Sequence, residues 1–168
     1  MNKQQLLESL KSEGFSKSIL DAFSKVKREN FIPNDLKNLA YQDTALPLEE
    51  GATISQPSTI AFMLDLLELK SNQKILEIGS GSGYVLALIL AIIKKGKIYG
   101  IEIIEGLAEK SQKILKKYKI IIIYNMDGSK GLPDKALFDR ILISASADKI
   151  PEHLYTQLKD KGILVTPV

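Results

Sequence analysis

Apolar residues in the first seventy positions recur three or four residues apart, which is the spacing of amphipathic helices. This spacing predicts two short helices, within residues 6–10 and 19–26, with Gly14 between them. The segment Phe31–Thr53 is rich in proline, aspartate and glycine instead, and predicts an extended loop. A third helix is expected from Pro57 onwards, because proline favours the first helical turn and an apolar stripe follows it.

From Lys74 the pattern changes to short apolar runs that alternate with helical segments. Helices are predicted over Tyr84–Lys94, Leu107–Lys117 and Glu152–Leu158. The alternation predicts an α/β fold with a parallel sheet, helices on both faces and right-handed crossovers. Four consecutive isoleucines in the third run predict a strand buried on both faces. The five predicted strands are Lys74–Ile78, Lys97–Glu102, Lys119–Tyr124, Phe138–Ser144 and Ile163–Val168.

Composition narrows the possible chemistry. The 168 residues are 45% hydrophobic and 26% charged, which is typical of one globular domain. The net charge of +3 is spread along the chain and does not indicate a nucleic-acid partner. The chain has no cysteine and one histidine, His153, so we expect neither a thiolate nucleophile nor a metal site. The longest apolar run, Val85–Ile93, is too short for a membrane span, and no signal-like segment precedes it; we expect a cytoplasmic protein.

The most informative motif is the glycine-rich turn Gly79–Gly83, between a predicted strand and a predicted helix. Its alternate glycines permit positive φ and allow the backbone to approach a ligand closely. The turn lies at the carboxyl end of the first predicted strand, where parallel sheets bind their ligands. By itself the motif also fits a simple strand-to-helix turn. Glu77 would repel a pyrophosphate, and Tyr84 stands where the dinucleotide motif needs a small residue. A dehydrogenase is therefore disfavoured.

Two carboxylates favour S-adenosyl-L-methionine as the ligand. Glu77 suits the ammonium group of a methionine, and Glu102, at the end of the second predicted strand, suits two ribose hydroxyls. S-adenosyl-L-methionine carries these groups with no phosphate between them, and its product after methyl transfer is S-adenosyl-L-homocysteine. Asp127-Gly128 follows the third predicted strand, where an acid suits the adenine amino group, although this pair alone is typical of a turn.

Seven segments, in a fixed order, cover nearly the whole chain and resemble one enzyme family. They are VKRENFIP (Val26–Pro33), YQDTALPL (Tyr41–Leu48), TISQPSTIAFML (Thr53–Leu64), ILEIGSGSGY (Ile75–Tyr84), DGSKGLP (Asp127–Pro133), FDRILISASA (Phe138–Ala147) and IPEHLYTQLKDKGILVTPV (Ile150–Val168). The family is protein-L-isoaspartate O-methyltransferase. The resemblance implies a Rossmann-like methyltransferase fold in one domain, with N-terminal helices and a substrate loop in residues 1–70 and a cofactor-binding α/β core in 71–168.

The resemblance also implies a reaction and a site. The reaction transfers a methyl group from S-adenosyl-L-methionine to the free carboxyl of isoaspartyl residues, which repairs damaged proteins. Ser55 is implied as the active-site residue. Cofactor contacts are implied for Glu77, Gly79, Ser80, Gly81, Gly83, Glu102, Met126, Asp127 and Gly128. Substrate contacts are implied for Thr53, Ile54, Ser55, Ser144, Ala145 and Ser146.

Local patterns allow structural roles for several of these polar residues. Ser55 precedes a helix that begins with proline, so its local pattern favours an N-cap. His153 is expected to be an exposed bystander. Arg28, Asp139 and Arg140 are expected in structural ion pairs, although Arg28 could instead face the substrate cleft.

The chain departs from the family pattern at Ala52, Ile103 and Met126. Family members also continue for a few dozen residues beyond the position of Val168, so we interpret the chain as a naturally short or truncated member whose exposed last strand allows self-association. Two other functions stay open: a non-catalytic protein that binds S-adenosyl-L-methionine, and a methyltransferase for another acceptor. Base methylation is disfavoured, because Ser144–Ala147 contains no proline or aromatic residue.

Overall fold

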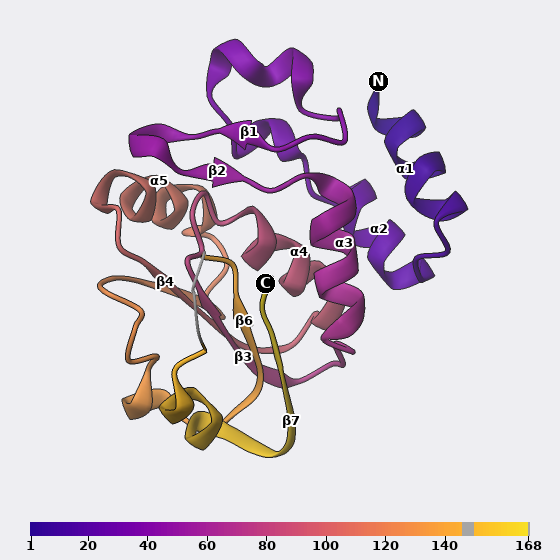
Figure 1. The fold of residues 1–168 in the computed structure, drawn as a ribbon. Helices are drawn as coiled ribbons and strands as arrows, with labels where there is room; N and C mark the ends of the chain where they lie inside the picture. The colour runs from indigo at the N-terminus through magenta and orange to yellow at the C-terminus, as the bar shows by residue number, and fades with distance from the viewer. Residues whose placement is uncertain (146–149, 168) are drawn as a thin grey trace.

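Five parallel strands form the central sheet, in the order β5-β4-β3-β6-β7 (Figure 1). The computed structural model describes residues 1–145 and 150–167. Because β3 comes first along the chain and pairs with both β4 and β6, it is the central strand. The predicted parallel sheet is confirmed. Its strands are β3 (Gln73–Ile78), β4 (Gly96–Glu102), β5 (Ile121–Asn125), β6 (Phe138–Ile143) and β7 (Leu158–Val165).

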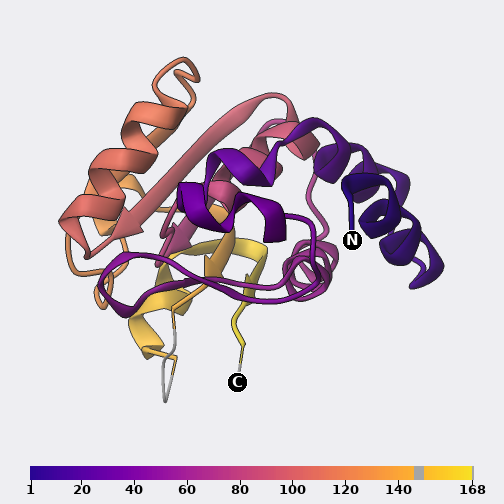
Figure 2. The same cartoon turned by 90° about the horizontal axis from the view of Figure 1, so that it is seen from above.

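The α-helices gather on one face of this sheet. α4 (Tyr84–Ile93) and α5 (Glu105–Leu115) connect β3 to β4 and β4 to β5. α2 (Lys17–Lys25) packs on α4, and α1 (Lys3–Ser12) and α3 (Pro57–Leu66) pack on α2. The other face carries two 3-10 helices, η4 (Pro133–Lys135) and η5 (Glu152–Gln157). In Figure 2, η5 (yellow) lies on the far side of the molecule from α1 and α2.

Two predicted elements near the end of the chain differ from the structure. The α-helix predicted over Glu152–Leu158 is the 3-10 helix η5, and β7 begins at Leu158 rather than Ile163. Pairing between β6 and β7 shifts register after Phe138, and Lys161 has a φ of 59°. The early part of β7 is polar and irregular, which conceals the strand from a search for apolar runs.

The segment predicted as an extended loop contains short regular elements. Three 3-10 helices, η1 (Arg28–Asn30), η2 (Asn34–Leu39) and η3 (Glu49–Gly51), lie in or next to it. Strands β1 (Leu46–Pro47) and β2 (Thr53–Ile54) pair in antiparallel fashion. This small hairpin leads directly into Ser55 and α3.

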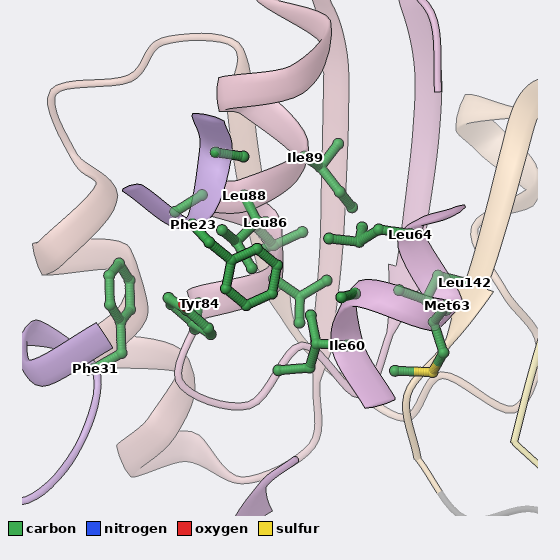
Figure 3. Close-up of a cluster of buried hydrophobic side chains, with 14 of the residues drawn as sticks. Phe23, Phe31, Ile60, Met63, Leu64, Tyr84, Leu86, Leu88, Ile89 and Leu142 are labelled. Atoms are coloured by element: carbon green, nitrogen blue, oxygen red, sulfur yellow. The ribbon is translucent and has the colours of Figure 1, made fainter. Parts of the chain in front are cut away.

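The larger hydrophobic core surrounds α4, which is apolar on all sides. Leu86, Leu88 and Ile89 are fully buried, as a helix without a polar face requires. The Tyr84 ring lies 6.2 Å from that of Phe23 and 5.4 Å from that of Phe31, measured between centroids (Figure 3). Neither α4 nor any other helix in residues 1–145 and 150–167 has the length and hydropathy needed to cross a membrane.

The isoleucine-rich strand is an edge strand, so the prediction of burial on both faces is wrong. Among the described strands, β5 pairs only with β4. The exposed fraction of Ile122 is 42%, whereas that of Ile123 is 8%. α5 packs on β5 and covers the face that contains Ile123.

This asymmetry predicts unequal effects of truncating the two isoleucines. Ile123→Ala should lower the free energy of unfolding by about 2–3 kcal/mol, because it leaves a cavity under α5. Ile122→Ala should cost less than about 1 kcal/mol, since its side chain is largely in water. Urea unfolding of the two variants measures both values, and equal losses would contradict the edge position of β5.

Candidate functional site

The candidate site lies at the carboxyl ends of the central strands. From β3 the chain continues to β4 and β5 on one side of the sheet. It then returns to the other side of β3, where β6 and β7 are added. Such a reversal opens a crevice beyond the strand ends, where α/β proteins bind ligands. The backbone N–H of Ser144 donates to the carbonyl of Ile78 at 2.8 Å, so the loops that follow β6 and β3 lie side by side.

The turn after β3 requires its glycines. Gly79 and Gly83 have φ values of 80° and 83°, in the left-handed region that side chains disfavour. A Cβ atom at Gly79 would lie 2.7 Å from the Cβ of Ala145, and one at Gly83 would lie 2.9 Å from Leu115. The turn therefore brings bare backbone against the neighbouring loop and starts α4 at Tyr84.

Glu77 is a buried carboxyl with one unused oxygen. Its Oε1 accepts a hydrogen bond from the Ser144 hydroxyl at 2.7 Å. Its Oε2 is buried and has no hydrogen-bond partner among the described residues. The pKa of Glu77 is raised to about 8, mainly by burial; the hydrogen bond from the Ser144 hydroxyl lowers it in part, and the charge of Glu102 adds to the rise. A buried, unpartnered carboxyl oxygen is costly and suits a cationic donor.

Glu102 ties the end of β4 to the glycine turn. Its Oε2 accepts from the backbone N–H of Gly81 at 2.7 Å, and its Oε1 accepts from that of Ile104 at 2.9 Å. Each oxygen of a carboxylate has two lone pairs, so both oxygens keep one for a ligand hydroxyl. Glu102 thus shapes the turn and still presents acceptors.

A cavity of about 300 Å³ opens beside the turn. Its walls are mainly apolar and come from the loops after β3, β4, β5 and β6. Asp127 supplies an acid, and hydrogen bonds from the backbone N–H and hydroxyl of Ser129 lower its pKa. A Cβ atom at Gly128 would lie 2.5 Å from Ile78, so glycine is needed there. The lining comprises Ile78, Gly79, Ile101, Ile103, Asp127, Gly128, Ser129, Ile143, Ala145, Pro151 and Leu154.

A second cavity, of about 40 Å³, lies between the glycine turn and the β1–β2 hairpin. Ser55, Glu77 and Ser144 line it together, although they are far apart along the chain. Gly79 lines both cavities, so the two adjoin. The predicted site residues around this small cavity are Thr53, Ile54, Ser55, Glu77, Gly79, Ser80, Gly81 and Ser144.

Residues 1–168 match the family model described as protein-L-isoaspartate(D-aspartate) O-methyltransferase (PCMT). The chain belongs to the PCMT family. Curated PCMT enzymes from Ignicoccus hospitalis and Petrotoga mobilis are 42% and 46% identical to it; the matches cover 99% and 95% of this chain and 81% and 76% of those proteins. PCMT enzymes use S-adenosyl-L-methionine as methyl donor.

Solved structures of PCMT proteins have the same fold. One, described as protein-L-isoaspartate O-methyltransferase, superposes with a TM-score of 0.89 at 29% identity and covers 99% of this chain, which spans 55% of that one. Another, from Plasmodium falciparum and in complex with S-adenosyl-L-homocysteine, has a TM-score of 0.86 at 28% identity. It covers 99% of this chain, which spans 84% of that protein. The predicted methyltransferase fold is therefore confirmed.

Three of the predicted PCMT site residues, Gly83, Glu102 and Met126, line neither cavity. Gly83 precedes α4 as its N-cap residue. Met126 is partly exposed and donates its backbone N–H to the carbonyl of Glu102. Ser146 lies outside the described residues. For these positions, as for the predicted residues that line the cavities, the cofactor and substrate roles stay predictions.

The structural role suggested for Ser55 by its local pattern is not observed. The N-cap residue of α3 is Gln56, and no side-chain cap bond comes from Ser55. Instead Asp43, from the preceding loop, accepts a hydrogen bond from the backbone N–H of Ser58 at 2.8 Å. The hydroxyl of Ser55 is thus not used for capping the helix.

Arg28 lines neither cavity, so it does not face the cleft as the sequence allowed, but it contacts the loop that carries Ser55. It is fully buried, and the ion pair expected for it is wrong: among the described residues its guanidinium contacts carbonyls only. Nη1 donates to Ala40 at 2.9 Å and to Gln42 at 3.4 Å. Nη2 donates to Thr44 at 3.2 Å and to the carbonyl of Ser55 at 3.1 Å. Arg28 therefore fastens the loop that carries Ser55.

Of the other two residues expected in ion pairs, Asp139 forms one and, among the described residues, Arg140 does not. Asp139 pairs with Lys159 at 3.0 Å, and hydrogen bonds from Lys74 and Lys159 lower its pKa against the effect of burial. Arg140 bonds to the carbonyls of Leu67 and Glu68, so its contacts resemble those of Arg28. His153 is exposed, as expected, and its Nε2 lies 2.8 Å from the carbonyl of Ser129.

Proposed function

We propose that this chain methylates the free carboxyl of isoaspartyl residues in damaged proteins, with Ser55 at the reacting centre. The observation that carries this proposal is the small cavity, which Ser55 lines together with Glu77, Ser144 and the glycine turn. Residues 1–70 provide the acceptor side of the cavity, and residues 71–168 provide the donor side, within one domain. We place this activity in the cytoplasm, with protein chains as partners.

The described residues fit S-adenosyl-L-methionine. The unpartnered Oε2 of Glu77 suits its ammonium group, because a buried carboxyl oxygen needs a donor. The adjoining apolar cavity suits its adenine, with Asp127 at the rim to accept from the amino group. Gly79 lines both cavities and carries no side chain that would obstruct a ligand reaching from one to the other.

The donor supplies an electrophilic methyl group on a sulfonium, and the chain holds the acceptor carboxylate and the donor in position for the transfer. An isoaspartyl carboxyl titrates near pH 4, so it is ionised at neutral pH and needs no general base. The Ser55 hydroxyl donates a hydrogen bond to the oxygen of this carboxylate that does not react, which aims the other oxygen. Leu48 and Ile54 exclude water from the cavity. Fixing the reacting atoms in line provides most of the rate enhancement.

Removal of the Ser55 hydroxyl tests this role. Ser55→Ala should lower kcat/KM for an isoaspartyl peptide by about 30-fold, which corresponds to the loss of one hydrogen bond to a charged group. Its affinity for S-adenosyl-L-methionine, measured by calorimetry, should stay unchanged. The exposed Ser71→Ala serves as the matched control. A peptide of the same sequence with ordinary aspartate should not be methylated, and equal rates on both peptides would refute the proposed specificity.

A further inference from the structure

We propose that a groove between η1 and α5 binds an acidic stretch of the damaged protein chain, next to the isoaspartyl residue that is methylated. The inference rests on the proposed function and extends it from the reacting carboxyl to the surrounding polypeptide. We call this feature the lysine groove and define it by Asn30, Phe31, Ile114 and five lysines described below.

The lysine groove consists of two adjoining cavities of about 280 and 460 Å³. Asn30, Phe31 and Ile114 line both cavities, so they form one continuous depression. The first cavity also shares Leu48 and Ser82 with the small catalytic cavity. A polypeptide whose isoaspartyl residue occupies the catalytic cavity therefore has a path into the groove.

The charge of the groove is strongly one-sided. The lining contains five lysines and one glutamate, a net charge of +4, whereas the whole chain carries +3. Glu49 forms an ion pair with Lys110, which links the β1–β2 hairpin to α5. Within the described residues, the remaining four lysines make no salt bridge. The five are Lys25, Lys27, Lys110, Lys113 and Lys117.

The surface between the lysines favours a polypeptide over a nucleic acid. Phe31, Leu90 and Ile114 give the groove an apolar floor, which suits side chains of an extended peptide. Nucleic-acid grooves commonly use arginine, whose planar guanidinium binds phosphate and stacks on aromatic groups. No arginine occurs among the residues that line the two cavities, all of which lie in the described part of the chain. The complementary occupant is therefore a segment in which acidic and apolar residues alternate.

Peptides with different extensions test this inference. A short isoaspartyl peptide is compared with versions extended by Glu-Leu-Glu, Gln-Leu-Gln or Lys-Leu-Lys, placed on either side of the isoaspartyl residue. On one side, the acidic extension should raise kcat/KM about tenfold over the lysine extension, and the gain should disappear at high salt. The glutamine extension should be intermediate.

Charge reversal in the groove gives the second measurement. Lys113→Glu combined with Lys117→Glu should abolish the preference for the acidic extension and leave turnover of the short peptide unchanged. Lys116→Glu combined with Lys119→Glu makes the same charge change at exposed positions outside the groove lining and should keep the preference.

Each outcome distinguishes the two proposals. If no isoaspartyl peptide is methylated, the proposed function fails. If the short peptide is methylated but the extensions on both sides are equivalent, only the lysine groove is refuted. The groove assignment is also overturned if both charge-reversal pairs have the same effect, or if a single-stranded RNA inhibits more strongly than a free acidic peptide.

Discussion

Replacing Arg28 with methionine should lower the free energy of unfolding by about 4 kcal/mol and reduce kcat about 100-fold in the molecules that stay folded. The stability is lost because four carbonyls that now accept from the guanidinium would be left without that donor. The rate is lost because one of these carbonyls belongs to Ser55, whose hydroxyl aims the acceptor in the proposed function. Arg28→Lys should recover only part of both, since an ammonium lacks the planar fork that reaches two segments at once.

Arg140 provides a matched control for this prediction. It is also a buried arginine that donates to backbone carbonyls, those of Leu67 and Glu68, but neither of these residues lines the catalytic cavity, whereas Ser55 does. Arg140→Met should therefore destabilise the fold and leave kcat per folded molecule near that of the unmodified protein. Thermal unfolding and active-site titration separate the two quantities. Equal kcat values for the two variants would show that Arg28 stabilises the fold without positioning Ser55.

Replacing Glu77 with glutamine should weaken binding of S-adenosyl-L-methionine about 100-fold at pH 8 and remove its pH dependence. In the proposed contact the ammonium of the ligand binds the ionised carboxyl, and Glu77, with a pKa of about 8, is mostly protonated below that pH. Affinity of the unmodified protein should therefore rise about tenfold per pH unit towards pH 8. Above that it should level off, because an α-amino group loses its proton near pH 8.

Calorimetry in buffers of different ionisation enthalpy measures the proton released when the ligand binds. Ser144→Ala removes the hydrogen bond that lowers the pKa of Glu77, so its affinity curve should move to higher pH. An affinity independent of pH between 6 and 8 in the unmodified protein would contradict the contact between Glu77 and the ammonium.

The same carboxyl makes stability depend on pH in the unliganded protein. The folded state keeps the Glu77 proton up to about pH 8, whereas the unfolded chain releases it near the ordinary value of 4.5. Stability should therefore fall as pH rises through this window, by about 1.4 kcal/mol per pH unit for this one group. Glu77→Gln should lack this decline. The difference in free energy of unfolding between this variant and the unmodified protein should therefore shift in favour of the variant from pH 5 to pH 8.

The sheet and its glycine turn could be predicted because they rest on local patterns. Apolar runs of strand length and alternate glycines after β3 are visible in any window of the sequence. The same approach misplaced β5, since four isoleucines resemble a central strand and only the strand order shows that Ile122 faces water. It also missed the first half of β7, which is polar and lies where the pairing with β6 shifts register.

The site was less predictable, because its key contacts join distant segments. Ser55 resembles an N-cap in its own neighbourhood, and only the fold shows that Asp43 supplies the cap bond to Ser58. Arg28 gave no signal for its role, since its partners are backbone carbonyls, which every residue carries. Carbonyl partners are invisible in a sequence until the path of the chain is known.

The walls of the small cavity come from two separate parts of the chain. Its acceptor wall, with Leu48 and Ser55, comes from the N-terminal segment, whereas its donor wall, with Glu77 and Ser144, comes from the sheet. An architecture of this kind permits an exchange of acceptors without a new methyl-donor site: grafting a different leading segment onto the same strands would redirect the chemistry. Because Phe23 and Phe31 pack on Tyr84 in the larger core, a grafted segment would also have to cover α4 in the same way.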